Sequence, residues 1–107
     1  MIIFVDIDET ICAHPHTGPS TEGDYAAATP IKENIAKINL LHKKGHTVIY
    51  WTARGSSTSI DWTDLTKRQL KDWGAQYDEL RLDKPYYNLF ICDKAISSEA
   101  FFKSNLL

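Results

Sequence analysis

The sequence predicts an α/β fold in which helices alternate with the strands of a mostly parallel sheet. Short apolar runs recur along the 107 residues, and segments with helical spacing lie between them. The first run is continuously apolar, which is typical of a strand that is covered on both faces. Strands that alternate with helices favour a parallel sheet with right-handed crossovers. The length is near the commonest domain size, so we expect one domain over residues 1–107.

The N-terminal part of the chain predicts a strand, a long loop and a helix. Ile2–Val5 is short, apolar and largely β-branched, as expected of a buried strand. Residues 11–29 carry prolines and glycines among small polar residues, which indicates a long loop or flap. Long ordered loops in compact domains usually serve a function. A helix is expected to begin with Thr29 as N-cap and Pro30 at its first position, and to end at Gly45.

Three further strands are expected after this helix. Thr47–Trp51 is the second buried run, residues 77–82 give a weaker third strand, and Leu89–Cys92 is the fourth. A helix capped by Ser59 or Asp61 is expected between the second and third strands. A final helix with Ser97 or Ser98 as its N-cap is expected after the fourth strand.

Composition and charge argue against several classes of function. The hydrophobic content of 43% and the charged content of 24% are those of a globular chain rather than a disordered one. A net charge of −2 gives no broad basic field, so a nucleic-acid partner is not expected. No apolar stretch approaches the roughly 20 residues of a membrane helix, and the start lacks the basic segment of a signal peptide. Cys12 and Cys92 are too few for a disulfide framework, so reduced thiols in a cytoplasm are expected.

Polar side chains lie where the apolar runs end. They are Asp6 and Asp8 after the first run, Thr52 after the second, Lys84 before the fourth and Asp93 after it. Because parallel strands end at one edge of a sheet, these side chains should converge. Mg²⁺ prefers oxygen ligands such as carboxylates, while a hydroxyl and an ammonium group stabilise the charge on a transferred phosphoryl group. The pattern therefore predicts a magnesium-dependent site for phosphoryl transfer.

These motifs resemble those of the haloacid dehalogenase-like (HAD) phosphatase superfamily. The superfamily has a strand ending D-x-D-x-T/V, a strand ending in Thr or Ser, a lysine, and a strand ending in one or two aspartates. The chain has VDIDET at 5–10, IYWTARG at 49–55, LDKPYYN at 82–88 and ICDKA at 91–95. The segments GDY, KKGH, WTARG, DWTDLTKRQL and KPYYNLFICDKA further resemble small phosphatases encoded with bacterial capsule and surface-polysaccharide biosynthesis.

The resemblance implies a role for each motif residue. Asp6 would be the nucleophile, and Asp8 would be the general acid and then the general base. Thr52 and Lys84 would bind the phosphoryl oxygens. Asp6, the backbone carbonyl of Asp8, and Asp93 would hold Mg²⁺.

The resemblance also implies a three-layer, Rossmann-like core without a cap domain. Only the 11–29 flap and the loop over 53–60 are long enough to cover the site, so an open active site is expected. The chain departs from many relatives at the fourth motif, where Cys92 stands in place of a first acidic residue. We expect this change to weaken the surroundings of the metal more than the site itself.

Two interpretations stay open for several residues near the motifs. Arg54 is either a surface residue or a ligand for a substrate anion. Asp24 and Tyr25 either line the substrate entrance or hold the flap in place.

Cys12, His14 and His16 form a C-x-H-x-H run that resembles part of a zinc site. Some HAD phosphatases carry a zinc-binding loop after the first motif, with further paired cysteines that are missing here. Three ligands fall short of the four that close a structural zinc site. The run is therefore either zinc-binding or an ordinary part of the loop.

The leading hypothesis is a Mg²⁺-dependent phosphomonoesterase that acts on a sugar or polyol phosphate. A receiver-type signalling module uses similar residues, but accepts phosphate on an aspartate at a mid-chain strand, where this chain has Thr52. A catalytically silent oligomerisation domain is the second alternative. Trp62, Tyr86 and Tyr87 are candidates for an oligomer interface.

Overall fold

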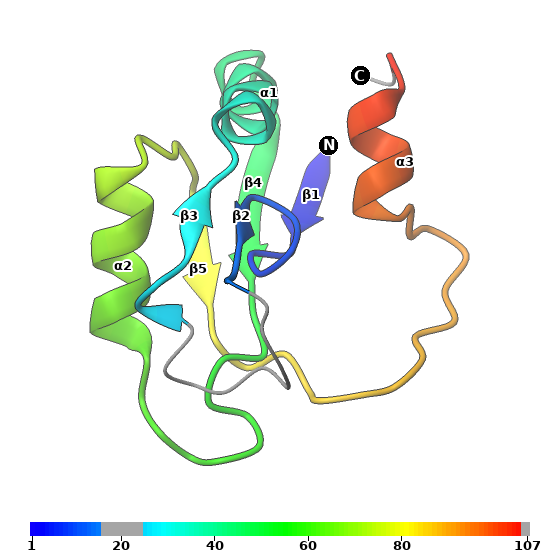
Figure 1. The fold of residues 1–107 in the computed structure, drawn as a ribbon. Helices are drawn as coiled ribbons and strands as arrows, with labels where there is room; N and C mark the ends of the chain where they lie inside the picture. Colours follow the sequence, from blue (N-terminus) through cyan, green and yellow to red (C-terminus); the bar gives the residue numbers. More distant parts are fainter. Residues whose placement is uncertain (16–24, 106–107) are drawn as a thin grey trace.

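The computed structural model describes residues 1–15 and 25–105 (Figure 1). Its strands are β1 (Ile2–Val5), β2 (Cys12–Ala13), β3 (Thr29–Pro30), β4 (Thr47–Trp51) and β5 (Glu79–Arg81). Its helices are α1 (Lys32–Lys43), α2 (Thr63–Asp72) and α3 (Ser98–Lys103). No helix in this described part has the length and apolar character needed to cross a membrane.

The main sheet has the order β1-β4-β5, and both pairings are parallel. Val5 lies opposite Tyr50, and Trp51 lies opposite Arg81. All three strands therefore end at one edge of the sheet, as the sequence predicted. The α/β class and the mostly parallel sheet are confirmed.

The described helices all pack on one face of this sheet. Val5, Val48 and Tyr50 share a buried cluster with Ile35 of α1 and Leu70 of α2. Two phenylalanines of α3 pack against the same cluster. Since side chains alternate along a strand, the neighbouring residues of β1 point to the opposite face, where they are exposed. The described residues therefore form two layers rather than the expected three, because none of the described helices covers the opposite face of the sheet.

The ends of the flap form a second, two-stranded sheet. Cys12 pairs with Pro30 and Ala13 pairs with Thr29 in antiparallel register. The prediction that Thr29 and Pro30 begin the helix is wrong, because their backbones are used in this ribbon. The amide of Ile31 donates to the Ile11 carbonyl at 2.8 Å, and α1 begins only after it. The middle of the flap lies outside the described residues.

The two later helices begin close to the expected residues. The Asp61 carboxylate accepts a hydrogen bond from the Thr63 amide at 2.9 Å at the start of α2. The Ser97 hydroxyl is the N-cap of α3 and accepts from the Ala100 amide at 3.2 Å. The third strand is also found, although shorter than expected, as β5.

The fourth predicted strand is not present. Residues 85–96, which we name the arm, leave the body after Lys84 and return at α3 (Figure 1). Leu89, Phe90 and Ile91 are exposed and belong to no strand. A parallel strand beside β1 needs a crossover of about 12 or more residues, and only residues 82–88 separate β5 from Leu89. The connection is therefore too short for the chain to place this run beside its own β1 in parallel.

Candidate active site

A pocket of about 210 Å³ lies where the strands end. Its described lining includes four of the five predicted motif residues, which are Asp6, Asp8, Thr52 and Lys84. Residues from β1, β4 and the segment after β5 thus meet in one place because the strands are parallel and in register. The fifth residue, Asp93, does not line this pocket.

Asp6 and Lys84 form the open side of the pocket. The Lys84 ammonium lies 3.6 Å from an Asp6 carboxylate oxygen, and the Asp6 side chain is 42% exposed. Burial raises the pKa of the Asp6 carboxyl above its usual range, and the charge of Lys84 opposes this shift. Lys84 is also near the rings of Trp51 and Tyr87. An ammonium beside one carboxylate and open to the pocket can bind an anion there.

Thr52 is held in place by the end of the sheet. Its amide donates to the Arg81 carbonyl at 3.0 Å, and its carbonyl accepts from the Lys84 amide at 3.3 Å. The hydroxyl accepts from the Arg54 amide at 3.2 Å. The threonine is therefore fixed in the pocket wall, next to the lysine with which it was predicted to act.

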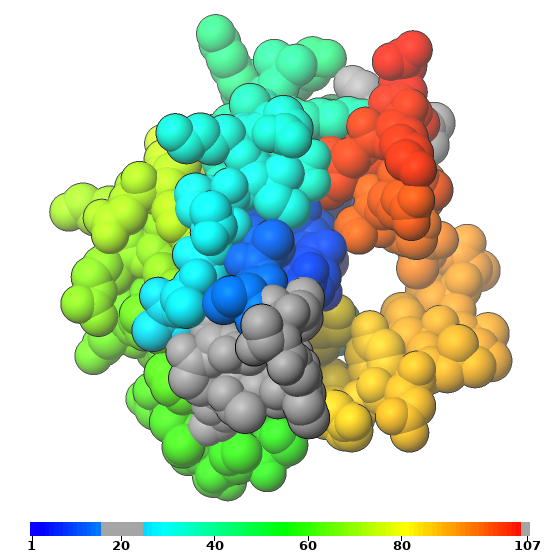
Figure 2. Space-filling model, in the orientation of Figure 1, coloured from blue at the N-terminus to red at the C-terminus, as the bar shows by residue number. Residues whose placement is uncertain are grey.

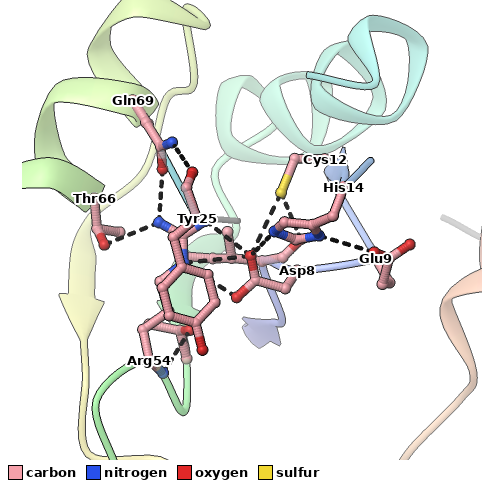
Figure 3. Close-up of polar contacts among 10 residues, drawn as sticks. Asp8, Glu9, Cys12, His14, Tyr25, Arg54, Thr66 and Gln69 are labelled. Atoms are coloured by element: carbon pink, nitrogen blue, oxygen red, sulfur yellow. Dashed lines mark hydrogen bonds and ion pairs between the residues drawn. The ribbon is translucent and has the colours of Figure 1, made fainter. Parts of the chain in front are cut away.

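Asp8 is bound by a buried arginine (Figure 3). The Arg54 Nη2 lies 2.8 Å from one Asp8 oxygen, and its Nε lies 3.1 Å from the other. The third nitrogen, Nη1, donates to Thr66 at 3.1 Å and to Gln69 at 2.6 Å. The whole Arg54 residue is only 2% exposed. This bidentate contact fixes the orientation of the Asp8 carboxylate.

Tyr25 covers the guanidinium from the flap side. The Tyr25 ring centroid lies 4.8 Å from the Arg54 carbon Cζ, and Gln69 donates to the Tyr25 carbonyl at 2.5 Å. The ring also stacks edge-on against Trp62 at 5.3 Å. Tyr25 therefore both pins the flap and lines the pocket, which are the two roles left open for it. Asp24 lies outside the described residues.

A histidine lies on the other side of Asp8. His14 Nε2 is 3.0 Å from an Asp8 oxygen, and its Nδ1 is 2.8 Å from Glu9. The side chain of His14 is 6% exposed. Glu9 reaches this position through a left-handed backbone with φ of 62°. Asp8 is thus held between an arginine and a histidine.

Asp8, Cys12 and His14 form a candidate metal-binding group. One ligand atom from each lies within 4.8 Å of the others. Burial and the neighbouring Asp8 charge raise the pKa of Cys12 to about 12, which opposes the thiolate form that binds metals. The Asp8 oxygen that lies near Cys12 and His14 is also contacted by the Arg54 guanidinium. These two features make the group a poor cation site, and His16 lies outside the described residues.

Asp93 lies on the arm and is exposed to solvent. Its carboxylate is contacted by the neighbouring Cys92 thiol, with 3.8 Å between sulfur and oxygen. The structure therefore brings together Asp6, Asp8, Thr52, Arg54 and Lys84, but does not bring Asp93 to them.

Sequence reasoning missed the residues that hold Asp8 in place. Thr66 and Gln69 are buried polar side chains three positions apart on α2, which places them on one helix face. Gln69 precedes the buried Leu70. Thr66 and Gln69 therefore form a polar pair at the edge of an apolar helix face, and this pattern in the sequence could have indicated a buried polar partner. Glu9 has no place in the motif pattern, yet its carboxylate contacts His14.

Comparison with known proteins gives a likeness of fold. No family model matches the chain, and no curated protein matches it either. The crystal structure of an MCSG target from Vibrio cholerae is similar to it, with a TM-score of 0.81 and 24% sequence identity. The likeness covers 99% of this chain and 91% of that one. At this identity it supports the overall α/β arrangement and carries no statement about activity.

Proposed function

We propose that the protein is a Mg²⁺-dependent phosphomonoesterase of the HAD type that works through an aspartyl-phosphate on Asp6. The observation that carries this proposal is the convergence of Asp6, Asp8, Thr52 and Lys84 in one pocket. They come from three separate segments of the chain, so chance grouping of surface polar residues is a poor explanation. A nucleophile, a proton carrier, a hydroxyl donor and a cation are what phosphate ester hydrolysis requires.

In the first step an Asp6 oxygen attacks phosphorus while the ester oxygen leaves. Asp8, in its protonated form, gives its proton to that leaving oxygen. In the second step water attacks the phosphorus of the aspartyl-phosphate, and the Asp8 carboxylate takes the proton from the water. Inorganic phosphate and free Asp6 result. Lys84 and Thr52 stabilise the charge on the phosphoryl oxygens in both steps.

Arg54 has a supporting role in this scheme. Its guanidinium is engaged by Asp8, Thr66 and Gln69, so it holds the proton carrier at a fixed angle to the pocket. Its contact with a substrate anion stays a prediction. Without the Arg54 contact Asp8 would be misplaced. Proton transfer would then be slower, because it needs hydrogen-bond geometry.

The residues of the pocket fit magnesium in part. Asp6 is half-exposed and offers hard oxygen atoms, as Mg²⁺ prefers, and the backbone carbonyl of Asp8 is close in sequence. The Asp8 side chain is less suitable, because it already pairs with Arg54 and His14. Asp6 and the Asp8 carbonyl would hold the ion from the body of this chain, and the ion would neutralise charge on the phosphoryl group. Asp93, the third ligand that the resemblance implies, does not line the pocket.

The substrate we propose is a phosphorylated sugar or polyol of surface-polysaccharide biosynthesis. The pocket is small and open, and Tyr86 and Tyr87 line its rim. Aromatic rings of this kind pack well against the apolar faces of a sugar. The two free thiols agree with a reducing compartment, so we place the enzyme in the cytoplasm.

Hydrolysis of p-nitrophenyl phosphate with and without Mg²⁺ tests the proposal. We expect Mg²⁺-dependent release of phosphate that falls by about 1,000-fold or more in Asp6→Asn, because the amide cannot act as nucleophile. Asp83→Asn is the matched control, since Asp83 lies next to Lys84 but bonds to Trp51 instead. Equal rates in wild type and Asp6→Asn would contradict the proposal. A panel of sugar and polyol phosphates ranked by kcat/KM then identifies the substrate.

A further inference from the structure

Two apolar surfaces of the molecule have no cover among the described residues. One is the arm, where Leu89 is 75% exposed and Ile91 is 87% exposed. The other is β1, where Ile2 is 70% exposed and Phe4 is 46% exposed. β1 is also an edge strand, so its outer backbone groups are not paired within the sheet. Exposed apolar edges of this kind are sites of association.

The arm has the sequence of a buried strand and the conformation of an unpaired segment. Its run Leu89–Cys92 is continuously apolar, as in strands that are covered on both faces. No hydrogen bond between two backbone groups joins residues 85–93 to another described residue. Figure 2 shows open space between the arm and the body of the molecule. The exposed aliphatic side chains of the arm and the backbone groups of residues 85–93 therefore lack partners among the described residues.

Both ends of the arm are nevertheless fixed to the body. At one end Ser56 donates to the Lys84 carbonyl at 2.6 Å. At the other, Lys37 of α1 donates to the carbonyls of Phe101 and Ser104 at 2.9 and 2.8 Å. With these anchors and the short connection after β5, the arm does not reach its own β1 in parallel orientation. An antiparallel approach would carry Asp93 to the wrong end of β1, away from Asp6.

We propose that the arm is exchanged between two copies of this chain and that it completes the active site of the partner. The run Leu89–Cys92 of each copy adds a parallel strand to the free edge of the other copy's β1. Aligning the ends of the two runs then sets Asp93 of the partner subunit beside Asp6, one strand spacing of about 4.8 Å away. Exchange of identical elements is a low-cost route to a dimer.

The exposed apolar surface is large enough for such a dimer. The large apolar side chains of β1 and the arm that stand exposed and lie outside the pocket are Ile2, Phe4, Leu89, Phe90, Ile91 and Ile96. With about 150–200 Å² for each complete side chain, they expose on the order of 650 Å² per chain. A reciprocal exchange would bury roughly 1,300 Å² in total, which lies within the range of about 1,200–2,000 Å² for specific interfaces.

The exchange supplies what the pocket lacks. Asp6 and the Asp8 carbonyl are at most two ligands from the body, and the carboxylate of the partner subunit's Asp93 is the third. The part of the inference that concerns Asp93 rests on the proposed phosphatase function, whereas the exchange itself does not. The two are therefore tested by separate measurements.

The first measurement mixes two inactive variants. Asp6→Asn removes a carboxylate of the body, and Asp93→Asn removes one of the arm. The two chains are unfolded together in equal amounts and refolded, and Mg²⁺-dependent hydrolysis of p-nitrophenyl phosphate is followed. With exchange, half of the dimers are mixed and one of their two sites is intact, so about a quarter of the wild-type rate returns. A rate no higher than that of each variant alone would overturn the proposal.

The matched control mixes Asp6→Asn with Asp8→Asn. Both substitutions lie in the body, so every site of a mixed dimer keeps a defect and no activity is expected. Recovery with this pair would show that some other element is exchanged, and would overturn the assignment of the arm.

The second measurement is independent of activity. In a Cys92→Ser background, chains with Phe4→Cys are mixed with chains that carry Ile91→Cys and are mildly oxidised. Opposed residues of paired strands are within disulfide reach, so a cross-linked pair of chains is expected on a denaturing gel. Leu40→Cys replaces Phe4→Cys in the control, because Leu40 is similarly exposed but lies on α1, and it should not cross-link.

Absence of this cross-link, with a monomer in sedimentation, would overturn the exchange whatever the activity. A cross-link in a protein that does not hydrolyse phosphate esters would support the exchange and contradict the proposed function.

Discussion

The pocket around Asp8 and the arm differ in how far their groups have partners within the chain. Around Asp8 each of the three guanidinium nitrogens of Arg54 donates a hydrogen bond, and the arginine is almost completely buried. In the arm, apolar side chains lie in solvent and the backbone makes no hydrogen bond to other described residues from 85 to 93. The polar groups of the first region find partners within the described chain, whereas the exposed aliphatic side chains of the second do not.

The difference agrees with the proposal that two copies of the chain share each active site. The body positions the groups that must be held rigidly, namely the proposed nucleophile and proton carrier. The arm carries Asp93 but has no surface of its own chain to lie on. Three predictions test the contrast between these regions, each with a control in the chain.

The largest expected effect follows from removing Arg54. Arg54→Ala leaves Asp8 without its guanidinium partner and leaves Thr66 and Gln69 without a donor. Loss of one partner of a buried ion pair destabilises by about 3–5 kcal/mol. Unfolding in urea measures this change. Arg81→Ala removes an exposed pair with Glu79, which solvent screens, and should therefore cost far less. Equal losses in the two variants would contradict the buried network.

An intermediate effect separates the core from the arm. Val5→Ala removes a buried side chain of the sheet and should lower stability by about 1–3 kcal/mol at every protein concentration. Ile91→Ala removes an exposed side chain, so we expect it to reduce only the concentration dependence of Tm, which comes from dimer formation. Thermal unfolding over a hundredfold range of concentration would show this. A loss from Ile91→Ala that is the same at all concentrations would contradict the exchange.

The smallest effect is a fall in stability at alkaline pH. Burial raises the pKa of Cys12 to about 12, and burial also raises the pKa of Tyr50. A raised pKa in the folded state means that the stabilising contribution is complete below the unfolded value and is lost as pH rises toward the folded value. Stability should therefore decline above about pH 9, by at most about 1.4 kcal/mol per pH unit for each group.

Substitutions at the two cysteines check this pH dependence. Cys12→Ala should flatten the alkaline decline, whereas Cys92→Ser, measured at a protein concentration at which the chain is monomeric, should leave it unchanged because Cys92 is exposed in the single chain. Tyr50→Phe should flatten it further at little cost in stability, because the Tyr50 hydroxyl is buried without a partner among the described residues. An unchanged decline in the Cys12→Ala Tyr50→Phe double variant would contradict the assignment.

Much of the site could be predicted from the sequence because it depends on strand ends. Asp6, Thr52 and Lys84 follow from apolar runs and from the rule that parallel strands end together. The partners of Asp8 could not be predicted, because the sequence alone does not tell whether an arginine is buried or exposed. Only its packing against α2 shows that Arg54 is buried. The run Leu89–Cys92 was misjudged for a different reason. Its composition is that of a strand, but the short connection before it decides where it can pair.

The most direct test of the proposed chemistry is to trap the phosphoryl group. Wild-type protein is mixed with a phosphate ester and Mg²⁺, stopped in acid within milliseconds, and digested for mass spectrometry. We predict a transient gain of one phosphoryl group on the peptide that carries Asp6, which is lost as hydrolysis proceeds and is absent in Asp6→Asn. A phosphoryl group on another residue, or no covalent species during active turnover, would contradict the role of Asp6.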